Sequence, residues 1–126
     1  MEIERFDDGG AFVARFGYCR AVRAGDLIFV SGTTADDREG EPLEDVYSQT
    51  REALQRVKSA VETLAPDAVI VRTRVFLTDA DTWQEAGRAH RELFADAPPA
   101  NTTLEIGRLI GPGLLVEVEA DAVVPR

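Results

Sequence analysis

The sequence predicts an α+β fold in which one β-sheet carries two helices on one of its faces. Two segments each show a single apolar stripe at helical spacing, and such a stripe has to be buried against another layer. The remaining regular segments alternate apolar and polar residues, as strands with one buried face do. The order of these elements predicts six strands and two helices in one two-layer domain spanning residues 1–126.

Three strands are predicted in the N-terminal quarter, at residues 3–6, 18–23 and 27–30. The first ends at residues 7–10 and the second at residues 24–26, both of which have turn compositions. Residues 27–30 are a continuous apolar run, which indicates a strand covered on both faces. Ser31 and Gly32 follow it, and small residues at a strand end either close a turn or allow the backbone to approach a ligand.

A polar stretch at residues 35–44 predicts an exposed loop, in which Asp36 and Asp37 are interpreted as solvated turn residues rather than metal ligands. Asp45 is predicted to cap the N-terminus of the first helix. Pro66 ends that helix. Its apolar face consists of residues spaced three and four apart, namely Leu54, Val57, Val61 and Leu64.

Residues 69–77 form the next predicted strand, and a second helix follows. One strand face carries Val69, Val71, Thr73, Val75 and Leu77, and the other carries Ile70, Arg72, Arg74 and Phe76. Asp81 and Gln84 resemble a capping box for the helix. The helix stripe consists of Trp83, Ala86, His90, Leu93 and Phe94. Gly87 costs about 1 kcal/mol relative to alanine and is interpreted as a mark of close packing, while His90 is interpreted as a packed, hydrogen-bonded histidine.

The last two strands are predicted at residues 102–106 and 114–124, with a turn at residues 111–113 between them. The apolar face of the last strand carries Val116, Val118, Ala120, Ala122 and Val124, and its opposite face carries Glu117, Glu119 and Asp121. Together with Arg72 and Arg74 these acids form a sheet face of mixed charge. Such a face is either open to water or pressed against another subunit. We favour an assembly in which the charges pair across strands.

Composition excludes several classes of function. The net charge of −9 disfavours a phosphate-binding surface, so no nucleic-acid partner is expected. One histidine and one cysteine provide no metal-ligand cluster, and neither a metal nor a cofactor is expected. The single Cys19 rules out an intramolecular disulfide and fits a cytoplasmic location. No export signal and no membrane span are expected.

Short motifs along nearly the whole chain resemble the RidA/YjgF family, the reactive intermediate deaminases. They are GY at 17–18, GDLIFVSG at 25–32, VFLTD at 75–79, PA at 99–100, LEIGRL at 104–109 and VEVEA at 116–120. The resemblance implies a chorismate-mutase-like fold. It also implies a homotrimer whose sheets form a central barrel, with the helices outside and a small-molecule cleft at each subunit interface.

The same resemblance implies hydrolysis of imines and enamines to a keto acid and ammonia. Members with this activity use a glutamate on the last strand to position water and an arginine after the Pro-Ala of the fifth strand to bind the substrate carboxylate. The resemblance implies Glu117 as the catalytic carboxylate. It implies substrate-binding positions at Tyr18, Ser31, Gly32, Asn101 and Thr103.

Asn101 stands where those members have the arginine. Arginine presents a charged planar fork to a carboxylate, whereas asparagine presents one uncharged amide. Deleting one partner of a buried charge pair typically costs about 2–5 kcal/mol. A 2-imino acid is therefore expected to bind poorly unless another cation takes over, the candidates being Arg20, Arg72, Arg74 and Arg108. Gly87 is a second departure, since arginine-bearing members often have asparagine there.

Several alternatives stay open on the residues alone. Glu117 is either a water-positioning base or, like Glu119 and Asp121, a partner of arginines across a subunit interface. Tyr18 either binds the ligand or lines the interface. The protein is predicted to be a hydrolase, or else a non-catalytic trimer that binds or senses a metabolite. A translation inhibitor with ribonuclease activity ranks last because of the acidic charge balance.

Overall fold

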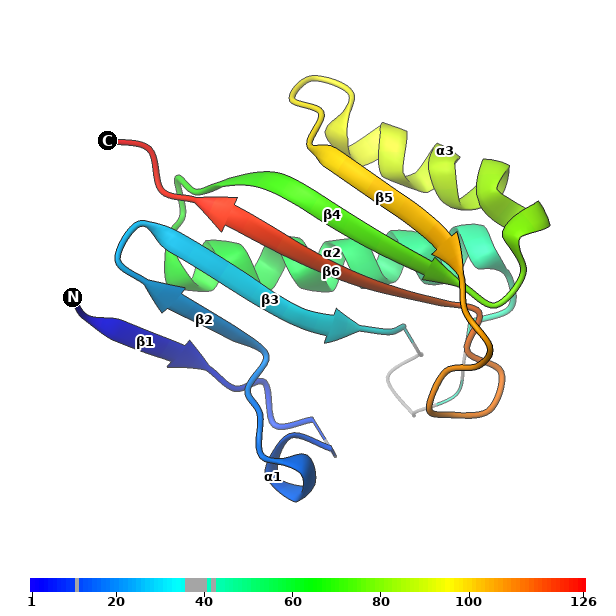
Figure 1. The fold of residues 1–126 in the computed structure, drawn as a ribbon, viewed down its shortest axis with the longest axis horizontal. Helices are drawn as coiled ribbons and strands as arrows, with labels where there is room; N and C mark the ends of the chain where they lie inside the picture. Colours follow the sequence, from blue (N-terminus) through cyan, green and yellow to red (C-terminus); the bar gives the residue numbers. More distant parts are fainter. Residues whose placement is uncertain (11, 36–40, 42) are drawn as a thin grey trace.

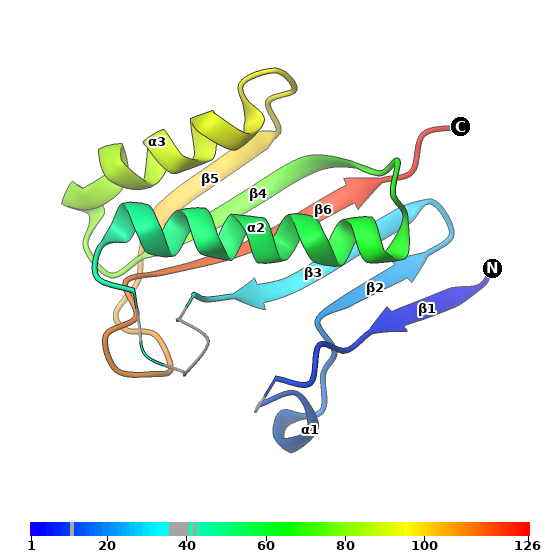
Figure 2. The ribbon, with the colours of Figure 1, turned by 180° about the vertical axis from the view of Figure 1, so that it is seen from behind.

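The computed structural model describes residues 1–10, 12–35, 41 and 43–126. It shows one mixed sheet with two long helices on one face (Figures 1 and 2). The strands are β1 (Ile3–Phe6), β2 (Ala21–Ala24), β3 (Leu27–Thr33), β4 (Val69–Leu77), β5 (Ala100–Glu105) and β6 (Val116–Val123). The helices are α1 (Val13–Phe16), α2 (Val46–Leu64), the 3₁₀ turn η1 (Ala80–Thr82) and α3 (Trp83–Phe94). The α+β class and the six-stranded sheet are therefore confirmed.

The last strand of the chain lies inside the sheet. The strand order is β1-β2-β3-β6-β4-β5, so β6 pairs with β3 on one side and with β4 on the other. All neighbouring strands are antiparallel except β4 and β5, which are parallel because α3 forms the crossover between them. This insertion places the residues of β6, including Glu117, between strands from both halves of the chain.

The core lies between the sheet and α2, as the apolar patterns predict. Leu54 and Val57 of α2 are fully buried against the sheet. From β6 the residues Val116, Val118, Ala120 and Ala122 are buried. The helix begins at its predicted cap, because Asp45 Oδ1 accepts a hydrogen bond of 2.7 Å from the Ser48 backbone N–H. It ends at Leu64, two residues before Pro66.

The N-terminal region differs from the prediction in three ways. The strand β2 begins only at Ala21, so Tyr18 precedes it, and the short helix α1 was not predicted. The prediction that residues 27–30 are covered on both faces is wrong within one chain, because α2 and α3 cover one face only. Leu27 and Phe29 are 47% and 46% exposed on the other face. Ala35 is fully buried, contrary to the predicted exposed loop.

Most of that predicted loop, with Asp36 and Asp37, lies outside the described residues.

The predicted faces of β4 are wrong at its N-terminal end. The register against β6 shifts between Ile70 and Arg72, so that Val71 is an extra residue in β4. The side-chain alternation therefore reverses at this point. Ile70 packs against the core, while Val69 and Val71 are each 42% exposed. From Thr73 onward the strand faces are as predicted.

The start of α3 also differs from the prediction. The capping carboxylate is Asp79 rather than Asp81, since Asp79 Oδ1 accepts from the Asp81 backbone N–H at 2.9 Å and η1 precedes the helix. The interpretation of Gly87 as a mark of close packing is wrong, because a Cβ atom there would meet no atom within 4 Å. Trp83 is 59% exposed within the chain.

The sheet face opposite the helices carries both apolar and charged side chains. Arg74 Nη1 lies 3.2 Å from Glu119 Oε1 and 3.5 Å from Asp121 Oδ2, so these two acids pair across strands inside the same chain. In the part of the chain that the structure describes, no helix is long and apolar enough to cross a membrane. Among those same residues, no three His, Cys, Asp or Glu side chains are grouped to hold a metal ion.

Candidate functional site

A register shift in β3 forms the first part of the site. Val30 pairs with Ala120 and Thr33 pairs with Val118, so Ser31 and Gly32 together lie opposite a single residue of β6. The shift is stabilised from the segment before β2. Ser31 N–H donates to the Arg20 carbonyl at 3.0 Å, and Ser31 Oγ donates to the Cys19 carbonyl at 2.7 Å.

Gly32 allows the carboxylate of Glu117 to lie directly against the backbone of β3. A Cβ atom at position 32 would be 2.9 Å from Glu117 Cδ and 3.0 Å from its Oε1. Any other residue would therefore displace the carboxylate. Of the two roles predicted for small residues here, the structure shows a close approach, and the approaching group belongs to the chain itself.

Glu117 is in an environment that favours its protonated form. Burial raises the pKa of the Glu117 carboxyl above its ordinary value, and the charge of Glu119 raises this pKa further. The guanidinium of Arg20 acts in the opposite direction. A carboxyl whose pKa is shifted toward neutral pH is better suited to exchange protons with a substrate or a water molecule.

Arg20 connects the other residues of this part of the site. No sequence pattern predicts this position for it. The residue is only 8% exposed. Its Nη1 donates to the Gly32 carbonyl and to Thr33 Oγ1, both at 2.9 Å. Its Nη2 donates to Tyr18 Oη at 3.3 Å, and its Cζ lies 5.5 Å from the centre of the Tyr18 ring. Its Nε lies 3.7 Å from Asp8 Oδ2, which is ion-pair distance but too long for a hydrogen bond.

Asn101 and Thr103 belong to a different hydrogen-bonded group, on the helix side of the sheet. Asn101 Nδ2 donates to Thr73 Oγ1 at 3.0 Å, and Thr103 Oγ1 donates to Asn101 Oδ1 at 2.9 Å. Thr73 Oγ1 also lies 2.8 Å from His90 Nε2. Burial lowers the pKa of His90 below its ordinary value. His90 is therefore hydrogen-bonded and half-buried, and the Asn101 amide is engaged with its neighbours.

The predicted site residues thus form two groups within one chain. Tyr18, Ser31, Gly32 and Glu117 are brought together around Arg20, a set named here the Glu117 cluster. Asn101 and Thr103 lie on the edge strand β5, with β4 between that strand and β6.

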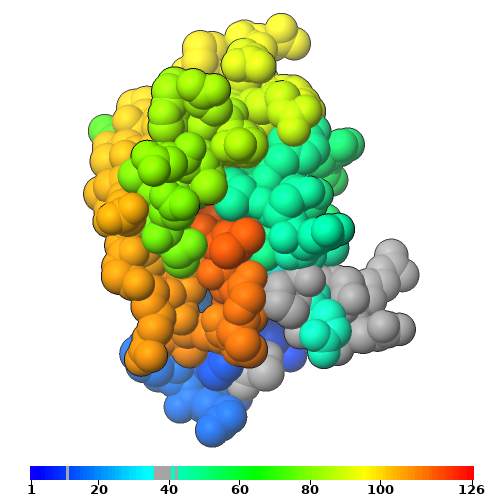
Figure 3. All heavy atoms as spheres, turned by 90° about the vertical axis from the view of Figure 1, so that its right-hand side faces the viewer, coloured from blue at the N-terminus to red at the C-terminus, as the bar shows by residue number. Residues whose placement is uncertain are grey.

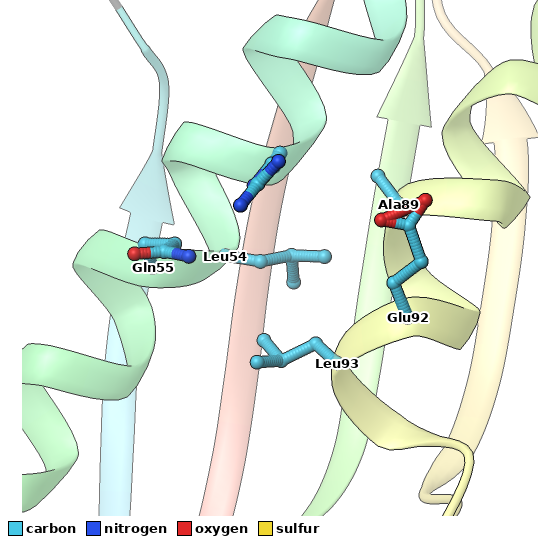
Figure 4. A pocket seen from close by; sticks show the side chains of 6 residues that line it. Leu54, Gln55, Ala89, Glu92 and Leu93 are labelled. Atoms are coloured by element: carbon cyan, nitrogen blue, oxygen red, sulfur yellow. The ribbon is translucent and has the colours of Figure 1, made fainter.

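Neither of two hollows on the surface coincides with these groups. One of about 220 Å³ lies between α2 and α3, where Leu54 and Leu93 face one another (Figure 4). The other, of about 530 Å³, lies along α3 beside Trp83 and Gly87. Figure 3 shows the molecule from the right-hand side of Figure 1, with α3 lying between β5 and α2. The Glu117 cluster therefore does not lie in the hollows formed between or beside the helices.

Fold and site together define an α+β protein with a mixed sheet, a helical layer on one face, and a half-buried carboxylate on the inserted last strand. Residues 9–124 match the family of endoribonuclease L-PSP. The chain belongs to this family, which is the RidA/YjgF family that the sequence motifs indicate.

Similar proteins match over almost the whole chain. The uncharacterized protein SCO2049 of Streptomyces coelicolor is 38% identical over 127 residues, covering 95% of this chain and 91% of its own. The crystal structure of Rv2704 of Mycobacterium tuberculosis, a member of the YjgF/YER057c/UK114 family, is 39% identical with a TM-score of 0.88 and covers 98% of this chain and 100% of its own. TdcF of E. coli, crystallised with bound serine, is 26% identical with a TM-score of 0.78, covering 98% of each chain.

Proposed function

We propose that the protein is a hydrolase that deaminates a small imine, enamine or related reactive metabolite, in clefts between the subunits of a homotrimer. The observation that supports this proposal best is the contact of Glu117 with Gly32. It fixes a half-buried carboxylate of raised pKa at a backbone position that no side chain occupies. This is the arrangement that a base needs in order to position and deprotonate water.

In the proposed reaction a water molecule bound by Glu117 attacks the carbon of the C=N bond. As the new C–O bond forms, Glu117 accepts a proton from the water and passes it to the nitrogen, giving a neutral carbinolamine. Glu117 then accepts the hydroxyl proton and passes it to the nitrogen as the C–N bond breaks, so that ammonia leaves, the oxygen becomes a carbonyl and Glu117 is again a carboxylate. Because Tyr18 Oη accepts from Arg20, its own proton is free to be donated to the substrate.

A cleft between subunits accounts for the separation of the two groups within one chain. All six residues of β5 are exposed, and among the described residues the strand pairs with β4 alone. The apolar Leu27 and Phe29 are exposed on the open sheet face. In the proposed trimer, Asn101 of one subunit lies beside the Glu117 cluster of its neighbour. The serine bound to TdcF supports a ligand of similar size for this fold.

The alternative is a non-catalytic trimer that binds a metabolite. One observation favours it, because both functional groups of the Asn101 amide are engaged with Thr73 and Thr103. Asn101 is therefore poorly suited to replace the carboxylate-binding arginine. Ribonuclease or translation-inhibitor activity, which the name of the family suggests, ranks third because the net charge of −9 opposes RNA binding.

A coupled assay tests the proposal. An amino-acid oxidase generates a panel of 2-imino acids, and semicarbazide traps whatever escapes hydrolysis. The wild type is compared with Glu117→Gln and Asn101→Arg. The matched control is Glu119→Gln, which changes the next carboxylate on the same strand face. We expect activity in the wild type and in Glu119→Gln, and its loss in Glu117→Gln.

The other outcomes separate the alternatives. A silent wild type with an active Asn101→Arg variant indicates that the catalytic residues are in place but act on a ligand without that carboxylate. Silence in every variant, together with saturable binding of a metabolite, favours the binding protein. Activity that persists in Glu117→Gln contradicts the role assigned to Glu117.

A further inference from the structure

We propose that Arg20 is a positioning residue of the site, which holds the Gly32 backbone and the Tyr18 hydroxyl in place around Glu117 rather than binding the substrate itself. This inference rests on the proposed function, because it assigns a role within the same site. It gives one of the four candidate cations a role other than replacing the missing arginine.

Burial and hydrogen bonding exclude Arg20 from direct contact with a substrate carboxylate. A substrate-binding arginine presents its two terminal nitrogens to the ligand. In Arg20 one of them donates to Gly32 and Thr33 and the other to Tyr18, while only 8% of the residue is exposed. The planar fork of the guanidinium is thus occupied by the protein itself.

The same hydrogen bonds place Arg20 behind both groups that act on the substrate. By bonding to the Gly32 carbonyl, Arg20 holds the segment against which the Glu117 carboxylate lies. By donating to Tyr18 Oη, it makes that oxygen an acceptor and directs the tyrosine proton elsewhere. The site therefore presents a donor, Tyr18, and an acceptor, Glu117. It is suited to a small ligand whose acceptor atom is next to the carbon that water attacks.

Charge gives Arg20 a second effect on Glu117. The groups that act on this carboxyl are Glu119 on its own strand, which favours protonation, and Arg20, which opposes it. Each has a further partner, since Glu119 is paired with Arg74 and Arg20 with Asp8. Removing the positive charge of Arg20 leaves the effects of burial and Glu119 unopposed, so the pKa of Glu117 has to rise.

A titration of the Glu117 side chain tests this without any need for activity. The ¹³C carboxyl resonance of Glu117, assigned with Glu117→Gln, is followed against pH in the wild type, Arg20→Lys and Arg20→Gln. We expect a higher pKa of Glu117 in Arg20→Gln, and a value closer to that of the wild type in Arg20→Lys, which keeps the charge. The matched control is Arg23→Gln, since Arg23 lies on β2 and donates to the carbonyls of Gly25 and Leu64 instead.

An exposed position provides a second variant in case Arg20→Gln does not fold. Asp8→Asn keeps the polar group that accepts from the Gly10 N–H and removes the negative charge beside Arg20. It is expected to lower the pKa of Glu117. An unchanged pKa of Glu117 in Arg20→Gln, or in Asp8→Asn where Arg20→Gln does not fold, would overturn the inference, as would an equal change in Arg23→Gln.

The activity assay separates this inference from the proposed function. In an active protein, Arg20→Lys is expected to lower kcat by on the order of 10²-fold, because displacing a catalytic group by about 1 Å has an effect of that size. As the pH is lowered, the activity of Arg20→Gln is also expected to fall off at a higher pH than that of the wild type, because Glu117 is protonated earlier. If the wild type is inactive but the titration shows the expected shifts, the hydrolase proposal fails and the positioning role of Arg20 stands. If the enzyme is active but the titration shows no shift, the hydrolase proposal stands and the positioning role of Arg20 fails.

Discussion

At the scale of single residues, the contact between Gly32 and Glu117 predicts that Gly32→Ala lowers activity more than stability. In Gly32→Ala the added methyl group overlaps the Glu117 carboxylate, which has to move away. The carboxylate is the end of a flexible side chain, so the free energy of unfolding should change by less than about 1 kcal/mol. Hydrolysis, in contrast, should fall by at least about tenfold because the base is displaced. Urea denaturation and the coupled assay measure the two effects.

Gly107→Ala is the matched control for this variant. A Cβ atom at Gly107 meets no atom within 4 Å, so both activity and stability should stay close to those of the wild type. Full activity in Gly32→Ala would show that the position of Glu117 against β3 is not needed for the reaction.

Glu117 also predicts a pH dependence of stability. Its pKa is raised in the folded protein, so between the ordinary value of 4.5 and the raised value the folded state binds more protons than the unfolded state. The contribution of Glu117 to stability is therefore fully present below 4.5 and is lost as the pH rises through the raised pKa. Glu117→Gln removes this dependence.

The test is a pair of urea denaturation series. The free energy of unfolding of Glu117→Gln minus that of the wild type is expected to be larger at neutral pH than at acidic pH, because only the wild type loses stability as Glu117 ionises. A difference that stays constant across this range would contradict the raised pKa.

The sequence predicted the identity of several site residues better than their arrangement. Glu117, Gly32 and Tyr18 were named because they match family motifs, and the structure places them around one arginine. Arg20 was only one of four candidate cations, because its role depends on burial and on contacts with residues 12 and 13 positions further along the chain. Asn101 was expected beside the substrate. Its engagement with Thr73 follows from strand register, which a single sequence does not specify.

At the scale of secondary-structure elements, the start of α3 makes the third prediction. Asp79 accepts the Asp81 N–H and so satisfies one of the free backbone donors at the start of η1. Asp79→Ala should lower the free energy of unfolding by about 1 kcal/mol, whereas Asp79→Asn should change it by much less. Asp81→Ala is the matched control and should have little effect, because its side chain is not the cap. Urea denaturation that ranks Asp81→Ala as the more harmful change would support the capping box instead.

Elements were predictable where one periodicity runs without interruption. The stripe of α2 and the alternation of β6 each follow from a constant spacing, and both are as predicted. Val71 shows the limit, since one extra residue reverses the faces of the residues before it relative to those after it and leaves no mark in composition. The 3₁₀ turn η1 likewise leaves no mark in composition, and because it precedes α3 the capping residue is Asp79, two residues before the predicted Asp81. The alternation of residues 27–30 was hidden because both faces are apolar.

At the scale of the whole molecule, the open sheet face makes the last prediction. The continuous apolar run of β3 indicated a strand covered on both faces, yet Phe29 is 46% exposed in the chain. The proposed trimer covers this face with other copies of the same sheet. Phe29→Glu would place a buried, unpaired charge in that interface, so it should dissociate the trimer. Sedimentation equilibrium and light scattering measure the mass directly.

The control adds the same charge on the opposite side of the molecule. Ser59 is exposed on α2, in the helical layer that lies in front of the sheet in Figure 2 and so on the side away from the open face, and Ser59→Glu should leave the assembly intact. Loss of the trimer in Phe29→Glu alone would place the interface on the open face. Loss of hydrolysis in the same variant would then follow from the separation of Asn101 from the neighbouring Glu117 cluster. A monomeric wild type with full activity would contradict both the trimer and the shared cleft.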